Sequence, residues 1–248
     1  MTGPRDGSTA EGQWERWPVL AALPELPLEG CRRAVVVAPH PDDEVLAVGG
    51  LLARLLAAGV PVVLVAATDG EASHPGSTVL PPERLRQVRV DETVRALAAL
   101  GAQPVEVHRL HLPDGELAAS EQALVDALIP LLDPAVWCLA PFAGDAHPDH
   151  EAAARAARAA CRTSGARLLE YPLWAWHWAV PDDPRVPWER AVRVPLDGPA
   201  RARKQRALAC YLSQTEPLGP APEDAAVVPP SVVAHFRRPF EVLLREPG

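Results

Sequence analysis

The sequence predicts an α/β fold in which helices cover both faces of a mainly parallel sheet. Three observations predict it: apolar stretches of strand length recur along the chain, helical stretches separate them, and the apolar stretches are continuous rather than alternating. With 248 residues and 48% hydrophobic content, the chain can bury one substantial core. We therefore expect a single Rossmann-like domain.

The expected elements alternate along the chain from the first apolar run onward. Strands are predicted at Ala34–Ala38, Pro61–Ala67, Val105–Leu110, Val136–Ala140 and Leu168–Tyr171. Helices are predicted at Glu44–Ala58, Pro82–Leu100, Glu121–Leu131, Asp149–Thr163 and Ala200–Leu212. Gly59 and Gly101 follow the first two helices, where a left-handed cap is expected. The Gly49–Gly50 pair inside the first helix is expected to permit close packing against the sheet.

The chain divides into three parts by composition. Residues 1–30 form a polar N-terminal extension, residues 31–215 the α/β domain, and residues 216–248 a Pro-rich segment expected to pack on that domain. Within the domain, an arm at about 174–199 is rich in Trp and Pro and has no clean periodicity. We expect ordered loops there, and the Trp residues make self-association into a homo-oligomer plausible.

Composition excludes several classes of partner. The net charge of −8 and the pI of about 5.5 argue against nucleic acid and against an electrostatic membrane anchor. The N-terminus lacks the pattern of a secretory signal, and no apolar run approaches the roughly 20 residues of a membrane span. The four cysteines are far apart and form no CxxC pair. We expect a cytoplasmic protein with reduced cysteines.

Polar clusters follow four of the predicted strands. They are His40–Glu44, Thr68–Glu71, His111–Gly115 and Phe142–His150. Ligands of open parallel sheets bind beyond the carboxyl ends of the strands. The four clusters are therefore expected to converge on one functional edge.

Two of these clusters contain residues with metal-ligand spacing. His40 and Asp43 lie at a strand-to-helix turn, and His147 and His150 lie with the same spacing at the start of another helix. Together they predict a nitrogen and oxygen site suited to Zn²⁺, with another divalent ion such as Fe²⁺ as the alternative. The competing interpretation is that the acids Asp42 to Glu44 only favour a helix N-terminus, but capping needs just one acid.

Asp42 and Asp43 are adjacent, so their side chains should point in different directions and only one should bind the ion. The other is positioned as a general base toward a water whose pKa the metal lowers. His40, Asp43 and one histidine of the second pair would leave an open coordination position, which is typical of a catalytic zinc site. Spacing alone leaves open which histidine binds.

The motifs APHPDDE at 38–44 and AHPDH at 146–150 resemble those of the PIG-L or LmbE-like de-N-acetylase family, and TDGEA, RVDETVRALAALG and LPDG support the likeness over roughly 33–163. The resemblance implies a zinc hydrolase that removes an acyl group, expected to be acetyl, from an N-acyl glucosamine substrate. It implies His40, Asp43 and His150 as zinc ligands and Asp42 as general base. It further implies that His147 polarises the carbonyl.

The resemblance also implies substrate contacts. Arg89 and Asp114 are expected to hold sugar hydroxyls. The Trp-rich arm holds Trp174, Trp176, His177 and Trp178, and its alternating Trp residues are expected on one side of an extended segment, against a sugar face or an aromatic aglycone. Trp174, Trp176 and His177 are the residues expected to contact the substrate. The arm looks like those of relatives that act on glycosylated natural-product precursors. The alternative is that the Trp residues only cover the sheet end or form a subunit contact.

Three other functions share part of this pattern. A non-haem iron oxygenase also uses two histidines and a carboxylate, but the additional Asp42 and His147 argue against it. A non-catalytic Rossmann-like binding module is disfavoured because no G-x-G-x-x-G follows the first strand and no P-loop lysine is present. A zinc amidase acting on another acylated amine or a thiol conjugate stays open.

Overall fold

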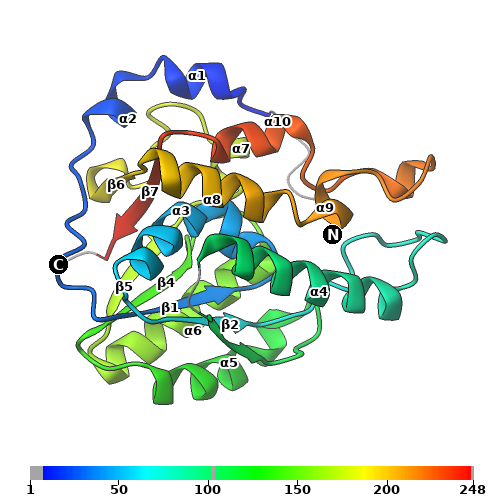
Figure 1. Cartoon of the computed structure of the whole chain (residues 1–248), viewed down its shortest axis with the longest axis horizontal. Helices are drawn as coiled ribbons and strands as arrows, with labels where there is room; N and C mark the ends of the chain where they lie inside the picture. The colour runs from blue at the N-terminus through cyan, green and yellow to red at the C-terminus, as the bar shows by residue number, and fades with distance from the viewer. Residues whose placement is uncertain (1–7, 102–103, 247–248) are drawn as a thin grey trace.

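The computed structural model describes residues 8–101 and 104–246, and a seven-stranded sheet runs through it in the order β3-β2-β1-β4-β5-β7-β6 (Figure 1). The parallel strands are β1 (Arg33–Ala38), β2 (Val62–Ala66), β3 (Glu106–Arg109), β4 (Val136–Pro141) and β5 (Arg167–Tyr171). The strands β6 (Ala191–Pro195) and β7 (Phe240–Arg245) add an antiparallel edge. The predicted mainly parallel α/β fold is confirmed.

Helices cover both faces of the sheet, which explains the continuous apolar strands. One face packs on α3 (Asp43–Ala57), α4 (Pro82–Leu100) and α8 (Gly198–Leu208), and the other on α5 (Glu121–Leu128) and α6 (Pro148–Ser164) (Figure 1). Along β1, Val36 belongs to the first core and Val35 and Val37 to the second, and all three are fully buried. Parallel strands buried on both sides have this composition.

Short helices complete the described chain. The α-helical ones are α1 (Glu11–Glu15), α2 (Pro18–Ala22), α7 (Ala175–Trp178), α9 (Leu212–Thr215) and α10 (Pro230–Val233). The 3-10 turns are η1 (Leu117–Ser120), η2 (Ile129–Leu131), η3 (Trp188–Arg190), η4 (Pro222–Asp224) and η5 (Ala234–Phe236). Within the described ranges, none of the helices combines the length and the apolar character needed to cross a membrane.

Two of the predicted features need correction. The late helix ends at Leu208 rather than Leu212, because the chain turns before α9 begins. Gly59 has the expected positive φ of 74°, but Gly101 is extended at −167°, so the left-handed cap predicted there is wrong. A Cβ on Gly101 would lie 3.0 Å from Leu56, which shows that close packing on α3 favours glycine there.

The two terminal segments take part in the fold. Leu26 donates a backbone hydrogen bond to the carbonyl of Arg193 on β6, so the N-terminal extension lies along the sheet edge around this residue. The Pro-rich C-terminal segment supplies β7, which lies between β5 and β6. The described part of this segment, 216–246, therefore completes the sheet.

A buried ion pair joins this C-terminal strand to helices α3 and α8. Glu241 on β7 accepts hydrogen bonds from the backbone N–H groups of Gly50 and Leu51 and from Lys204 Nζ, each at 2.7 Å. Gly50 leaves room for Glu241 and for Leu196, since a Cβ there would lie 3.0 Å from Glu241 Oε1 and 2.4 Å from Leu196 Cδ1. One carboxylate thus satisfies three donors in the core.

Replacing Glu241 with alanine should lower the free energy of unfolding by about 3–5 kcal/mol, because the change leaves the Lys204 ammonium buried without its partner. Urea unfolding followed by circular dichroism measures this loss. The matched control is Glu25→Ala, which removes an ion pair to Arg193 that is largely exposed and should cost less than about 1 kcal/mol. Equal losses in the two variants would contradict the structural role of Glu241.

Candidate active site

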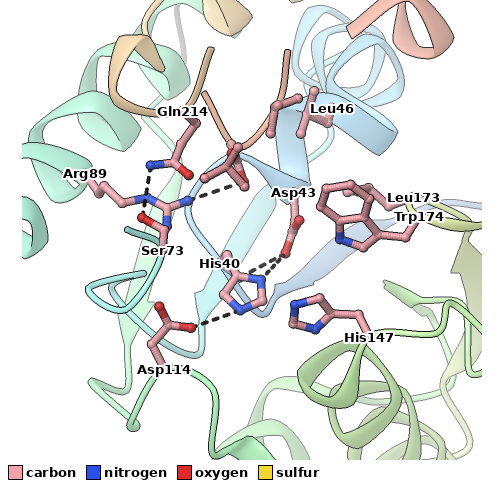
Figure 2. A pocket seen from close by; sticks show the side chains of 13 residues that line it. His40, Asp43, Leu46, Ser73, Arg89, Asp114, His147, Leu173, Trp174 and Gln214 are labelled. Carbon is pink, nitrogen blue, oxygen red and sulfur yellow. Dashed lines mark hydrogen bonds and ion pairs between the residues drawn. The ribbon is translucent and has the colours of Figure 1, made fainter. Parts of the chain in front are cut away.

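The histidines predicted to act together meet at the carboxyl ends of β1 and β4. Figure 2 shows two of them, His40 and His147. His40 precedes α3, whereas His147 caps α6 and His150 lies in its first turn. The ring centroids are 5.0 Å apart for His40 and His147, 4.6 Å for His147 and His150, and 5.4 Å for His40 and His150. Positions far apart in the sequence thus place three imidazoles around one point.

Asp43 lies between two of these rings. Its Oδ2 is 3.4 Å from His40 Nδ1 and 3.4 Å from His150 Nε2, and one ligand atom from each of the three residues lies within 4.8 Å of the others. His150 Nε2 is buried and has no hydrogen-bond partner among the described residues. A buried, unpartnered imidazole nitrogen beside a carboxylate fits a divalent metal ion, and two nitrogens and one oxygen match zinc chemistry.

Further carboxylates contact His40 and His150 at the ring nitrogens that face away from Asp43. Asp145 Oδ2 lies 2.7 Å from His150 Nδ1, and His40 Nε2 lies 3.2 Å from both Asp149 Oδ2 and Asp114 Oδ1. Carboxylates that bind the outer nitrogen of a ligating histidine fix its tautomer and orientation. Sequence reasoning missed Asp145 and Asp149 in this role, although both lie next to the histidines in GDAHPDH.

His40, Asp114 and Asp149 form a second group with metal-ligand spacing. Asp149 Oδ2 already accepts a hydrogen bond from Gly115 N, and Asp149 Oδ1 accepts one from Leu117 N. Since these bonds occupy Asp149 and join the loop after β3 to α6, the group is better described as the support of His40 than as a second ion site.

The electrostatics of the site favour a cation. Burial would lower the pKa of His150, but the charges of Asp43 and Asp145 raise it to about 9. Burial would likewise raise the pKa of Asp43, yet the neighbouring His150 and His40 hold it below its usual range. The carboxylates therefore draw positive charge to the imidazoles, and a divalent ion can take the place of those protons.

His147 differs from the other two imidazoles. Burial and the positive charges of His150 and His40 lower its pKa to about 2, so the ring is neutral. Its Nδ1 accepts a hydrogen bond from the backbone N–H of Asp149 at 3.2 Å. The proton of the neutral ring is therefore on Nε2, where it is available to a ligand.

Asp42 adopts a backbone conformation that is rare for a residue with a side chain, with φ at 116°. Two neighbours hold this turn: Glu44 Oε2 accepts from Asp42 N at 3.1 Å, and Arg89 donates to the carbonyl of Pro41 at 2.5 Å. Tyr211 donates a short hydrogen bond to Glu44. Residues supported in such strained conformations cluster at functional sites.

The Asp42 carboxyl group is itself buried, 3.6 Å from the Arg89 guanidinium. Burial raises the pKa of Asp42 well above its usual range, and Arg89 opposes this. A carboxylate whose pKa is raised is a stronger proton acceptor than an ordinary aspartate side chain.

A pocket opens over these groups. Its cavity measures about 40 Å³, and its lining includes His40, Asp42, Asp43, Ser73, Arg89, Asp114, His147, Trp174 and Gln214. Arg89 and Asp114, both predicted to contact substrate, thus line the pocket (Figure 2). The RxxE spacing of Arg89 is typical of a surface residue pair, but its side chain is only 2% exposed and binds the carbonyls of Gly70 and Pro41.

The Trp-rich arm needs a correction. Residues Ala175–Trp178 form the short helix α7, so the prediction of an extended segment with its Trp residues on one side is wrong. Trp174 lines the pocket, whereas Trp176 points into a buried cluster with Trp14 and Trp188, covered by Arg238. His177 lies near Trp174 and is absent from the lining of this pocket. The helical turn separates side chains that an extended segment would align.

The other histidines have local partners. His74 Nδ1 lies 3.0 Å from Ser73 Oγ, His108 Nε2 2.6 Å from Glu106, His111 Nδ1 2.6 Å from Asp69, and His235 Nδ1 2.6 Å from Glu11. Gln214 donates to Ser73 Oγ at 3.3 Å, and both of these side chains line the pocket. The polar part of the pocket thus extends from the candidate metal-binding residues His40 and Asp43 to Ser73 and Gln214.

Comparison with known proteins places these residues in a family context. The family model described as PIG-L, GlcNAc-PI de-N-acetylase, matches residues 35–161. A protein of Nocardia farcinica named 1D-myo-inositol 2-acetamido-2-deoxy-alpha-D-glucopyranoside deacetylase is 32% identical over 168 residues, which cover 57% of this chain and 56% of that protein. The chain spans about half the length of the curated relatives it matches.

Solved structures share the fold. A conserved protein of Thermus thermophilus is 30% identical, with a TM-score of 0.54 over 73% of this chain and 79% of that one. The N,N'-diacetylchitobiose deacetylase of Pyrococcus horikoshii is 20% identical, with a TM-score of 0.61 over 86% of this chain and 82% of that one.

Proposed function

The chain belongs to the PIG-L family, GlcNAc-PI de-N-acetylase, and from this premise we propose that it is a metal-dependent hydrolase that removes an N-acyl group from a glucosamine-type substrate. The observation that carries the proposal is the buried group of His40, Asp43 and His150 with Asp42 beside it. The small-molecule substrate would be an N-acetylated amino sugar, free or as part of a glycosylated natural-product precursor.

His40, Asp43 and His150 would hold the metal ion, for which Zn²⁺ is the first candidate and Fe²⁺ the second. When bound, the ion would polarise the amide carbonyl and lower the pKa of a water molecule toward neutrality. Asp145 and Asp149 would keep the outer nitrogens of the two histidines protonated, so that their inner nitrogens face the ion.

The remaining steps belong to side chains of the pocket. Asp42 would take the proton of the attacking water and then pass it to the departing amine nitrogen, which leaves a carboxylic acid and a free amino sugar. His147, protonated at Nε2, would donate to the carbonyl oxygen as negative charge develops there. Arg89 would fix the turn that carries Asp42. Asp114 would accept a hydrogen bond from a sugar hydroxyl group.

A zinc amidase acting on another acylated amine or on a thiol conjugate would use the same metal group. The polar lining of Ser73, Arg89, Asp114 and Gln214 favours a sugar, because a polyhydroxylated ligand needs several hydrogen-bonding partners that an alkyl amine does not. This lining is the reason to rank the amino sugar first.

Purified protein should release amine from N-acetylglucosamine compounds, and removal of metal by a chelator should abolish this release. Added Zn²⁺ should restore it, because Asp42 and His147 alone cannot activate both water and amide. Amine release from a panel of N-acetyl glucosamine compounds and N-acetyl alkyl amines measures both the metal dependence and the substrate preference. Circular dichroism checks that the metal-free protein stays folded. Full activity in protein shown to be metal-free would contradict the proposal, and a preference for the alkyl amines would favour the amidase.

A further inference from the structure

The start of the short helix α7 is anchored on the buried side chain of Asp145. The backbone N–H groups of Leu173, Trp174 and Ala175 donate to this carboxylate at 3.0, 3.0 and 2.8 Å. Trp178 Nε1 donates to the backbone carbonyl of Asp145 at 3.1 Å. A helix of four residues is too short to be stable by itself. These four hydrogen bonds therefore fix where α7 begins.

The end of α7 is held by the N-terminal extension. Trp14 Nε1 donates to the carbonyl of Trp176 at 2.9 Å. Thr9 donates twice, from its backbone N–H to the carbonyl of His177 at 2.9 Å and from Oγ1 to the carbonyl of Ala179 at 2.6 Å. The last carbonyls of a helix have no partner within it, so the N-terminal extension supplies the partners that α7 lacks.

These contacts are shielded from water. Trp14 is fully buried, and its ring meets that of Trp176 edge to face with 5.1 Å between centroids. Thr9 is only 4% exposed. Because a buried donor or acceptor that loses its partner costs free energy, each of these hydrogen bonds restricts the position of α7.

Asp145 joins α7 to a candidate metal ligand. Its Oδ2 accepts the backbone N–H of Trp174 at 3.0 Å and also lies 2.7 Å from His150 Nδ1. A shift of α7 would therefore move the oxygen that orients the His150 ring. Metal ligands must be held within about 0.5 Å of their productive geometry, so such a shift would weaken metal binding.

We propose that Thr9 and Trp14 are positioning residues for His150 and act on it through α7 and Asp145. This inference rests on the metal-dependent hydrolase proposed above. Thr9, Trp14 and α7 lie outside the segment 35–161 that the family model matches, whereas Asp145 and His150 lie inside it. The N-terminal extension and the Trp-rich arm thus act on the metal site from outside the matched segment.

Trp14→Phe tests this connection, because phenylalanine keeps an aromatic ring and removes the Nε1 donor. Its affinity for Zn²⁺, measured by competition with a chromophoric chelator, should fall about 3- to 10-fold, the effect of one buried hydrogen bond on an equilibrium. Trp17→Phe is the matched control, since the two rings pack together at 5.8 Å but only Trp14 donates a side-chain hydrogen bond within residues 8–101 and 104–246. The control should keep its Zn²⁺ affinity within about twofold, because it breaks no hydrogen bond of α7.

Two further measurements separate positioning from a merely structural role. Urea unfolding of the metal-free proteins should show some loss of stability in both variants, since each leaves space in the aromatic cluster. Only Trp14→Phe should also lose Zn²⁺ affinity. In an Asp145→Asn background, where the connection to His150 is already altered, Trp14→Phe should change the Zn²⁺ affinity by less than about twofold.

The outcomes separate this inference from the proposed function. Equal Zn²⁺ affinities of Trp14→Phe and Trp17→Phe, or additive effects of Trp14→Phe and Asp145→Asn, would overturn the positioning role and leave the hydrolase standing. Wild-type protein that binds neither Zn²⁺ nor Fe²⁺ would overturn the proposed function and the positioning role with it. If Trp14→Phe does not fold, Thr9→Val takes its place, because valine keeps the shape and the backbone N–H of threonine. Its Zn²⁺ affinity should fall at least about threefold, and an unchanged affinity would count against the positioning role.

Discussion

Replacing Asp42 should lower kcat by about 10²- to 10⁴-fold while the metal stays bound, because proton transfer by a positioned base contributes a rate factor of this size. Asp42 lines the pocket but lies outside the group of His40, Asp43 and His150 whose ligand atoms converge. Asp42→Asn is the sharper variant, since asparagine tolerates the positive φ of 116° better than alanine does. Turnover of N-acetylglucosamine and the metal content per chain measure the two effects.

Asp42→Ala should lose turnover to a similar degree and additionally lose some stability, because aspartate and asparagine adopt a positive φ more readily than alanine does. Asp91→Ala is the control, since Asp91 is exposed on α4 and contacts only Gln87 among the described hydrogen bonds of its side chain. Activity of Asp42→Asn within a few fold of wild type would show that another group accepts the proton.

Much of this site follows from the sequence because its candidate metal ligands lie in two short motifs at strand ends. His40 and Asp43 flank one turn, and His147 and His150 flank another, so local spacing and the rule for parallel sheets suffice to bring them together. The strand limits also follow, since the apolar runs of β1, β2 and β4 are continuous. At these motifs and strands, the local sequence pattern predicts the position that each residue takes in the folded chain.

The parts that sequence reasoning missed depend on contacts between distant segments. Glu241 lies 37 positions from Lys204 and much farther from Gly50, and nothing local in FEVLLR marks it as their shared partner. Val228 enters the pocket from a Pro-rich stretch without periodicity. The sequence pattern instead assigns Trp176 to the pocket wrongly. The alternation of Trp residues suggests an extended segment, whereas the chain forms the helical turn α7.

Arg89 and Glu44 show how burial changes a role. Both are helix residues whose spacing is typical of exposed acids and bases, yet they are 2% and 0% exposed and hold the turn of Asp42. A charged residue is buried only where it is paired. Their partners include backbone groups of Pro41, Gly70 and Asp42. A pattern of side chains in the sequence does not predict such backbone partners.

His150→Ala should lose bound metal and activity together, in contrast to Asp42→Asn. Removing the imidazole deletes a ligand atom and leaves Asp145 without its partner, so metal affinity should fall by more than the roughly 10- to 100-fold typical of losing an outer carboxylate. Asp145→Asn should show that smaller loss. Metal content after dialysis against buffers of defined free Zn²⁺ gives the two affinities.

Asp43→Ala should also lose the metal, but it removes in addition the hydrogen bond that Asp43 Oδ2 accepts from the backbone N–H of His40 at 2.9 Å. The unfolding free energy should therefore fall more for Asp43→Ala than for a surface histidine variant such as His111→Ala, whose side chain is 61% exposed. His111→Ala should keep wild-type metal content, since its ring contacts Asp69 rather than the metal group. If His150→Ala bound Zn²⁺ as tightly as His111→Ala, the ligand set would have to exclude His150, and His147, 4.6 Å away, would be the ring to test in its place.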